Sequence, residues 1–210
     1  MRGDGVAPDQ TRALALMEAA AENGDLTAQY ELTKIFSKGE ETPEDRAKAF
    51  KWLTRAAEGG HPEAQFYLAN ALDNGLGVVA DKPEALRWYR RAAEQGMPIA
   101  QRILGTAYMT GADSLEPNAS EALRWLSAAA QAGDPGAMFN LASAYGGDFG
   151  ILRNDEQALL WLRAASESGL ARASFTLAQY IETGRGALAE IKAAAAMCRT
   201  AYAQGGGRGA

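Results

Sequence analysis

The chain has 210 residues, 47% of them hydrophobic, and its 21 Lys and Arg against 26 Asp and Glu give a net charge of -5. An acidic chain lacks the basic surface that a phosphate backbone requires, so no nucleic-acid partner is expected. No apolar run approaches the roughly 18 residues of a membrane-spanning helix, so no membrane insertion is expected either.

One period organises most of the sequence. The tryptophans are Trp52, Trp88, Trp125 and Trp161, which follow one another at steps of 36, 37 and 36 residues. A period of this size is typical of a solenoid, in which each repeat contacts only its neighbours. The sequence therefore predicts an all-α fold, an α-solenoid of stacked helix-turn-helix repeats of about 36 residues.

The first expected element is a helix over residues 10–23, which follows a loop and belongs to a partial repeat, 1–24. Asp9 is its expected N-cap, and Leu16 takes the place of the later tryptophans. Five complete repeats are then expected, each a pair of helices, within one solenoid domain. The repeats are 25–60, 61–96, 97–133, 134–169 and 170–205, the last a C-terminal cap, and 206–210 is expected to be a flexible tail.

The first helix of each repeat has an alanine and a leucine one turn apart, as at Ala64 and Leu68. This spacing is helical and puts both residues on one buried stripe. The leucines are Leu32, Leu68, Leu104, Leu141 and Leu177, and the residues expected to extend each stripe are Ile35, Leu72, Ala107, Ala144 and Tyr180.

The second helix of each repeat bears the tryptophan, which we assign to the core because an alanine three residues earlier allows helices to approach closely. An aromatic ligand cage is the alternative. The expected N-caps, whose side chains accept from free backbone N–H groups, are Asp45, Asp81, Asn118 and Asn154. The expected left-handed stops at the other end are Gly60, Gly96, Gly133 and Gly169.

The stretch Gly75–Ala85, with Trp88, Ala92, Ala93 and Gly96 after it, resembles a Sel-one-like repeat, a branch of the tetratricopeptide-type helical solenoids. The pattern covers residues 3–205. The resemblance implies a right-handed superhelix of helix hairpins that acts as an adaptor or regulator of protein complexes. In bacteria such proteins are often exported or envelope-associated, and the family has no shared catalytic residues.

The first helix of each repeat also has a row of side chains that points away from the buried stripe, two, six and nine residues after the alanine at about 100° per residue. In tetratricopeptide-like stacks this row lines the concave groove, so the resemblance implies a binding site there for a peptide or partner domain. The alternative is that the aromatic members pack sideways on neighbouring helices. The candidate groove residues are Tyr30, Lys34, Phe66, Asn70, Asp73, Arg102, Thr106, Met109, Phe139, Ser143, Phe175, Gln179 and Glu182.

Nothing in the sequence indicates catalysis, a metal or a cofactor. The pattern Gly75-x-Gly77-x-x-Ala80 resembles a dinucleotide motif but follows no expected strand. His61 stands in a between-repeat turn, where a capping role is expected rather than metal ligation. The single cysteine, Cys198, cannot form a disulfide within the chain. We therefore predict a protein that is not an enzyme and that needs neither metal nor cofactor.

Basic residues recur on the tryptophan helices, among them Lys51, Arg55, Arg91 and Arg124. A solvated convex face explains them, and an anionic partner is the alternative.

We predict a monomeric adaptor that binds another protein or a peptide in the groove. An inhibitory regulator of an envelope signalling or secretion pathway is the alternative, and a lactamase-like hydrolase is a more remote one. The segment Met1–Val6 lacks the apolar stretch of a signal peptide, so a cytoplasmic location is the default, and a periplasmic one follows if the chain is a fragment of an exported protein. Residues 3–9 reproduce the loop at 75–81 with no helix before them, so we expect either a segment of a longer array or a capping helix with a truncated leader.

Overall fold

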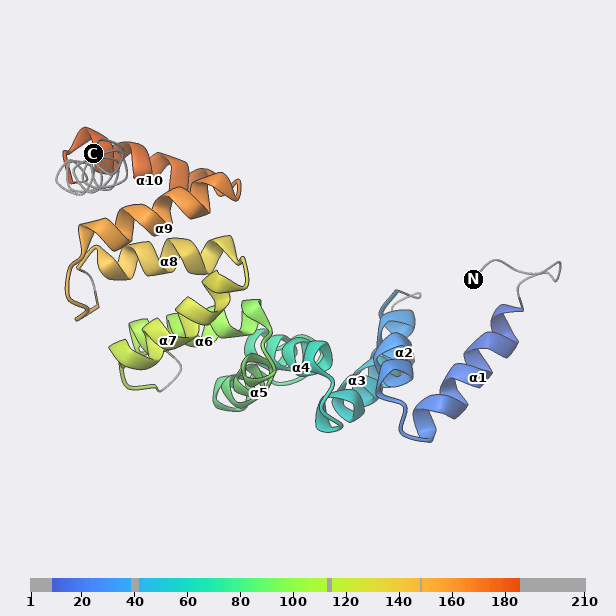
Figure 1. Cartoon of the computed structure of the whole chain (residues 1–210). Coiled ribbons are helices and arrows are strands. Elements are labelled where there is room, and N and C mark those ends of the chain that lie inside the picture. The colour runs from blue at the N-terminus through green and yellow to red at the C-terminus, as the bar shows by residue number, and fades with distance from the viewer. Residues whose placement is uncertain (1–8, 39–41, 113–114, 148, 186–210) are drawn as a thin grey trace, which may run out of the picture. The chain divides into compact units, whose positions relative to one another are not determined.

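The computed structural model describes residues 9–38, 42–112, 115–147 and 149–185, which form helices and no strand (Figure 1). The all-α solenoid of helix-turn-helix repeats that the sequence predicts is confirmed. The expected eleventh helix near Met197, with Cys198, the loop before Asp9 and the tail 206–210, lies outside the described residues. The helices are α1 (Gln10–Glu22), α2 (Leu26–Lys38), α3 (Pro43–Glu58), α4 (Pro62–Asn74), α5 (Lys82–Glu94), α6 (Pro98–Thr110), α7 (Ala119–Gln131), α8 (Pro135–Tyr145), α9 (Asp155–Glu167) and α10 (Ala171–Glu182).

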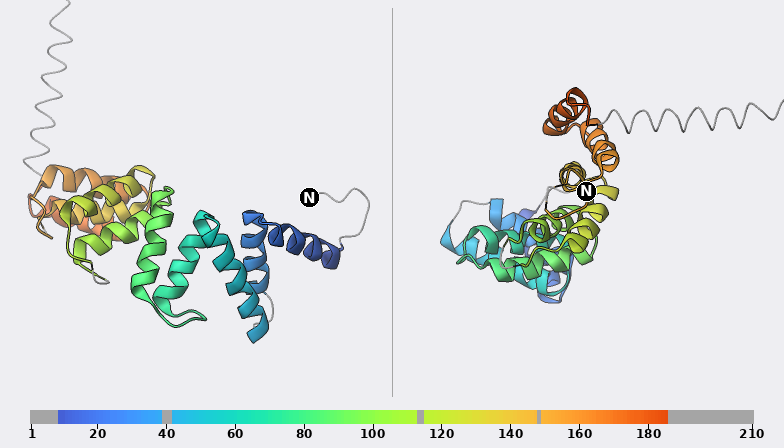
Figure 2. Two further views of the ribbon diagram at one scale, coloured as in Figure 1. Left: turned by 90° about the horizontal axis from the view of Figure 1, so that it is seen from below. Right: turned by 90° about the vertical axis from the view of Figure 1, so that its left-hand side faces the viewer.

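The chain divides into two compact units, Met1–Ala100 and Gln101–Ala210. In the first unit each helix from α1 to α4 packs on the next one along the chain, and in the second unit α7 to α10 do the same (Figure 2). Packing between sequence neighbours is what a repeat protein requires, because each hairpin buries its apolar stripe on the next. That both units form one solenoid domain stays a prediction.

Small and large apolar residues alternate in the cores of both units. Trp52, Trp88 and Trp125 are buried with the alanines that surround them, whereas Trp161 is half-buried. Leu177 is also half-buried, and it packs against the cluster around Leu162. The buried anchor leucines are Leu32, Leu68, Leu104 and Leu141.

Two apolar positions assigned from the repeat pattern lie outside the core. Ile35 is 40% exposed, and its neighbour Phe36 packs against the core in its place. Leu16 is 65% exposed, while Leu14 and Met17 face the core cluster of Leu32 and Trp52. The stripe of α1 is therefore rotated relative to that of the tryptophan helices.

The expected N-caps are confirmed in four helices. The side chains of Asp9, Asp81, Asn118 and Asn154 each accept a hydrogen bond from the backbone N–H three residues later, at 2.9 to 3.1 Å. The fifth expected cap, Asp45, is wrong. There Thr42 is the N-cap: its hydroxyl accepts from the N–H of Asp45 at 3.1 Å.

The earlier start of α3 follows from Pro43. Proline has its φ set for the first helical position and needs no partner for an N–H, and it holds the preceding residue extended. Thr42 has ψ of 151° and its hydroxyl donates to the Asp45 carboxylate at 2.6 Å. Helix α3 therefore has 16 residues, where the other tryptophan helices have 13.

The turns between repeats are fixed by a glycine and, in the first unit, by a buried glutamine. Gly60 has a φ of 101°, which a side chain would strain. Gln65 Nε2 then donates to the carbonyl of Ala57 at the end of α3, at 3.2 Å, beside the backbone N–H of Gly60, which donates to the same oxygen at 3.0 Å. Gln95 Nε2 donates to Gln65 Oε1 at 2.8 Å and to the Gly60 carbonyl at 2.9 Å, which links one turn to the next.

Helices α6 and α7 meet at a glycine. A Cβ on Gly105 would lie 2.8 Å from Leu126 Cγ and 3.0 Å from its backbone nitrogen. Because the obstacle includes backbone, the contact requires glycine. Near this contact Met109 of α6 joins the core cluster that contains Leu126.

Candidate functional site

In the first unit the candidate groove residues lie on α2 and α4 and are all half-buried: Tyr30, Lys34, Phe66, Asn70 and Asp73. Their aromatic members form part of a connected cluster of rings. The Tyr30 ring lies 4.6 Å from that of His61 and 6.1 Å from that of Tyr67, stacked on it. Sideways packing of an aromatic on the neighbouring helix, the alternative for this row, is therefore what Tyr30 does.

Tyr67 is a surface residue that the sequence analysis missed. It is 50% exposed and stands between Tyr30 and Phe66, whose ring lies 5.3 Å away at a steep angle. Phe66 in turn contacts Tyr89 at 5.8 Å. Tyr67 is three residues after the anchor Ala64, so it lies outside the row at offsets of two, six and nine that the helical periodicity predicts.

The polar groups around this cluster are partly paired. Lys34 forms an ion pair with Glu31 and lies over the Tyr30 ring, 5.0 Å from its centroid. Burial raises the pKa of Tyr30 to about 12, and the neighbouring Tyr67 and Glu63 add to the shift. The phenol of Tyr30 is therefore a neutral group at physiological pH.

In the second unit three candidate residues of α6 and α8 contact side chains of the neighbouring repeat. Arg102 Nε lies 3.0 Å from Asp134 Oδ1 but makes no aligned hydrogen bond, so the contact is an ion pair. The Thr106 hydroxyl accepts from Asn140 Nδ2 at 2.9 Å. Phe139 is covered by the Arg172 guanidinium at 4.6 Å. The Arg102 guanidinium is thus already matched by a carboxylate.

Met109 is not a groove residue. It is only 8% exposed and belongs to the core cluster of Leu126, Leu141 and Ile151. That cluster draws on α7, α8 and the segment before α9, which a helical wheel of α6 alone does not include.

The remaining candidates are the most accessible. Phe175 on α10 is 67% exposed, and Gln179 and Glu182 on the same helix are exposed as well. Ser143 on α8 is half-buried, and its hydroxyl donates to the Phe139 carbonyl at 3.2 Å. These positions lie on helices of one unit and are joined through the α8, α9 and α10 packing.

A cavity of about 940 Å³ in the first unit also lay outside the sequence prediction. It lies between α2, α3 and the loop after α4, and apolar side chains such as Phe36, Phe50, Leu53 and Leu76 line it. Its size suits an apolar side chain or ligand.

Basic residues of the tryptophan helices contact aromatic rings and carboxylates of the protein itself. The guanidinium of Arg91 lies 4.4 Å from the Trp88 ring centroid, and that of Arg124 lies 4.4 Å from that of Trp125. Glu121 pairs with Arg124 at 3.1 Å and accepts from Trp125 Nε1 at 3.0 Å. These side chains cover the tryptophan faces. Their contacts explain the basic residues without the alternative hypothesis of an anionic partner.

No catalytic or metal-binding group stands out in the part of the chain that the structure describes, where no three His, Cys, Asp or Glu side chains gather. His61 is the N-cap of α4, with Nδ1 3.5 Å from the Ala64 nitrogen. Across the same residues, no helix has the length and apolar character to cross a membrane.

Comparison with known proteins agrees with the repeat pattern. The Sel1 repeat family model matches residues 1–25, 26–61, 62–97, 98–134 and 135–170. A protective antigen with an SLR fold, present in uropathogenic Escherichia coli strains, is similar at 32% identity and a TM-score of 0.74, over 81% of this chain and 36% of that one. A Sel1 repeat protein from Oxalobacter formigenes is similar at 31% identity and a TM-score of 0.65, over 83% of this chain and 50% of that one. The chain thus spans half or less of these two proteins, and no curated protein matched it.

Proposed function

Because this chain belongs to the Sel1 repeat family, whose members generally serve as protein-interaction scaffolds, we propose that it is a non-catalytic adaptor that binds a peptide or partner domain. The proposed binding surface is formed by the first helices of the repeats. In the first unit it comprises Tyr30, Phe66, Tyr67 and Asn70, here called the α2–α4 face.

The exposed ring of Tyr67 is the observation that supports this surface best. A tyrosine half exposed on a rigid helix, held by stacking on Tyr30 and edge contact with Phe66, loses little conformational entropy on binding. Tyrosines of this kind are enriched among the residues that dominate binding energy in interfaces. The ring cluster therefore offers a preorganised apolar anchor.

Asn70 supplies the polar component of the α2–α4 face. It is half-buried on α4, one turn after Phe66 and almost one turn after Tyr67. A side-chain amide both donates and accepts, so it can pair with the backbone of an extended peptide. The combination of an aromatic anchor and an amide suits a peptide or a loop of a partner domain.

The exposed candidates of the second unit give a second surface of similar character. On α10 the exposed ring of Phe175 is followed one turn later by the side-chain amide of Gln179. An inhibitory regulator would use the same surfaces with a different partner, and it is therefore a special case of the adaptor.

The test is a double substitution on the α2–α4 face, Tyr67→Ala with Asn70→Ala. Partners are captured from the native cell with the wild-type chain, and their Kd values are then measured by calorimetry with purified components. The double variant should bind at least tenfold more weakly, about 1.4 kcal/mol, with little change in melting temperature. Arg102 is left intact because its loss would unpair Asp134.

The matched control is Arg87→Ala with Arg124→Ala on the tryptophan helices, where each arginine pairs with a glutamate of its own helix. This control should keep wild-type affinity. Binding that survives the α2–α4 substitutions and disappears in the control would place the partner on the opposite surface and overturn the proposal.

A further inference from the structure

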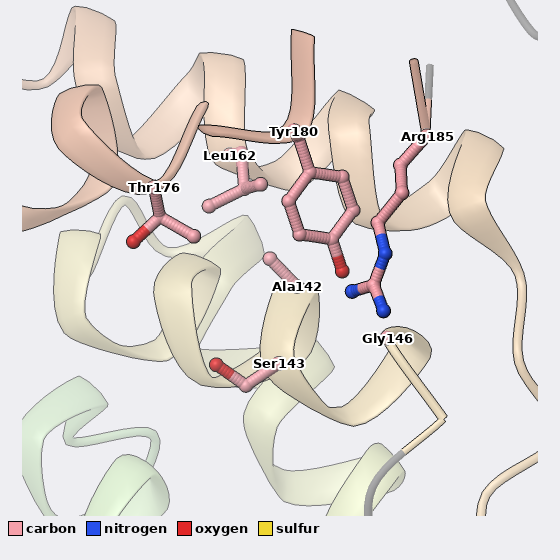
Figure 3. Close-up of a pocket in the computed structure, with 7 residues that line it drawn as sticks. All are labelled: Ala142, Ser143, Gly146, Leu162, Thr176, Tyr180 and Arg185. Atoms are coloured by element: carbon pink, nitrogen blue, oxygen red, sulfur yellow. The ribbon is translucent and has the colours of Figure 1, made fainter. Parts of the chain in front are cut away.

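We propose that a small polar cavity in the second unit binds the carboxylate of a peptide. The cavity has a volume of about 200 Å³ and lies between α8, α9 and α10 (Figure 3). Ser143 and Gly146 come from α8 and its end, Leu162 from α9, Tyr180 from α10, and Arg185 follows α10. The inference rests on the proposed function, since it names the chemical group of the bound peptide that this site would hold.

A glycine in the lining of the cavity makes room for the Tyr180 hydroxyl. A Cβ on Gly146 would lie 2.8 Å from the hydroxyl oxygen of Tyr180, so any side chain there would displace the phenol. The equivalent positions of the other repeats are Ser37, Asp73, Met109 and Glu182. Of these five positions only Gly146 lacks a side chain, and it leaves room for Tyr180 of α10, the first helix of the following repeat.

Two hydrogen-bond donors converge on this space. In Figure 3 the Tyr180 hydroxyl and the Arg185 guanidinium point the same way, toward Gly146. The guanidinium carbon lies 5.4 Å from the centroid of the Tyr180 ring, so the ring helps to hold it. The Ser143 hydroxyl donates to the Phe139 carbonyl, and that of Thr176 donates to the Arg172 carbonyl at 2.9 Å. Tyr180 and Arg185 are thus the donors left to a ligand.

The charge of Arg185 is not matched within the described residues, where no carboxylate lies at ion-pair distance from it. The nearby Arg153 differs, because it binds Asp155 through two hydrogen bonds of 3.0 and 2.8 Å. That pairing shows the geometry a carboxylate takes with a guanidinium fork. A carboxylate at Arg185 would repeat it, with the Tyr180 hydroxyl as a third donor.

Size and charge favour a carboxylate over larger or more highly charged anions. A cavity of about 200 Å³ has the volume of roughly seven water molecules at about 30 Å³ each, enough for a carboxylate and the methylene groups beside it. A phosphate dianion would require more than one unmatched cation, and the site supplies one. Leu162 and Ala142 give the cavity an apolar floor suited to the methylene groups.

The test uses the full chain and four probes: an N-acetylated trialanine with a free C-terminal carboxylate, its C-terminal amide, an amidated peptide with one central glutamate, and inorganic phosphate. Binding is followed by amide NMR shifts of Ser143, Gly146 and Tyr180. We expect saturable shifts with one or both carboxylate peptides and none with the trialanine amide. The peptide that binds identifies the source of the carboxylate, a chain terminus or an acidic side chain.

Arg185→Gln should raise the Kd of the bound peptide at least tenfold, Tyr180→Phe several-fold, and Arg185→Lys by an intermediate factor. The matched control Arg163→Gln, on the exposed side of α9, should bind like the wild type. Equal affinity in Arg185→Gln, phosphate binding without peptide binding, or no response to any probe would overturn the proposal. These titrations use peptides rather than a captured partner, so they fail or succeed independently of the α2–α4 test.

Discussion

One carboxylate oxygen of Asp134 contacts both the backbone N–H of Ala137 and the guanidinium of Arg102. This oxygen, Oδ1, accepts from the N–H of Ala137 at 2.7 Å, which caps α8, and lies 3.0 Å from Nε of Arg102 on α6. The aspartate is therefore both a helix cap and the link between the first helices of two consecutive repeats. Arg102, a candidate for partner binding, is part of this structural link.

Asp134→Ala should destabilise the protein by about 1–2 kcal/mol, because it removes an N-cap and leaves Arg102 without its anion. Asp134→Asn keeps an acceptor for the cap and should cost less. The loss of stability is measured as a decrease in the urea concentration at the midpoint of unfolding. Asp25→Ala removes the same cap from α2, where the side chain accepts from Ala28 at 2.8 Å, and should cost less than Asp134→Ala. Equal losses would mean that the Arg102 contact adds nothing.

Trp88→Ala should cost about 3–5 kcal/mol, since truncation of a buried aromatic removes apolar area and leaves a cavity. Trp88 is 8% exposed and lies beneath the Arg91 guanidinium. Thermal unfolding of Trp88→Ala is compared with that of Arg90→Ala, an exposed position on the same helix that should cost under about 0.5 kcal/mol. Similar melting temperatures for the two variants would contradict a core role for the tryptophan.

Gln65→Leu tests the turn between repeats. The substitution keeps a similar volume but removes two hydrogen bonds, the one to the Ala57 carbonyl and the one from the Gln95 amide, at a cost of about 1–3 kcal/mol in all. Urea unfolding measures the loss. Gln131→Leu, at the exposed end of α7, is the control and should be close to neutral. A neutral Gln65→Leu would show that water replaces the glutamine.

The stability of the protein should fall between pH 10 and about pH 12 because of Tyr30, whose pKa burial raises from 10.0 to about 12. The unfolded phenol ionises first, so the stability contributed by the neutral phenol is complete below pH 10 and is lost as the pH rises through the folded pKa. Tyr30→Phe should show a smaller loss over this range in urea unfolding. Its tyrosinate absorbance titration should also lack the step at the highest pH, and an unchanged titration would refute the assignment.

The repeat period predicted the helices because each hairpin packs on the next through the same tryptophan and leucine positions. The distance between these residues in the sequence therefore equals the length of one hairpin. Local chemistry then predicted caps such as Asp81 and Asn118. The same template failed at Asp45, because it copied the spacing of the other repeats and ignored Pro43, which moves the start of α3 to Thr42. At this helix the local effect of Pro43 determined the N-cap, and the spacing of the repeat did not.

The candidate binding residues could be predicted only in part. An ideal helical wheel gives the direction of Met109 but not the core cluster of Leu126, Leu141 and Ile151 that this residue joins. The same wheel cannot show that Arg102 meets Asp134, because the two residues are 32 positions apart and in different helices. The cavity at Tyr180 and Arg185 could not be predicted either. Gly146 makes room for the Tyr180 hydroxyl only in the folded protein, where the end of α8 lies against α10.

The hydrogen bonds between repeats also bear on how the chain folds. Gln95 reaches Gly60 across 35 residues and Gln65 across 30, and Asn140 reaches Thr106 across 34. The entropy of loop closure rises only with the logarithm of loop length, so these closures cost nearly the same wherever they form. Folding can therefore begin in any hairpin and extend to the next one, at the fast rates typical of local contacts. During synthesis, each hairpin can dock on its predecessor as it leaves the ribosome, before the rest of the chain has been made.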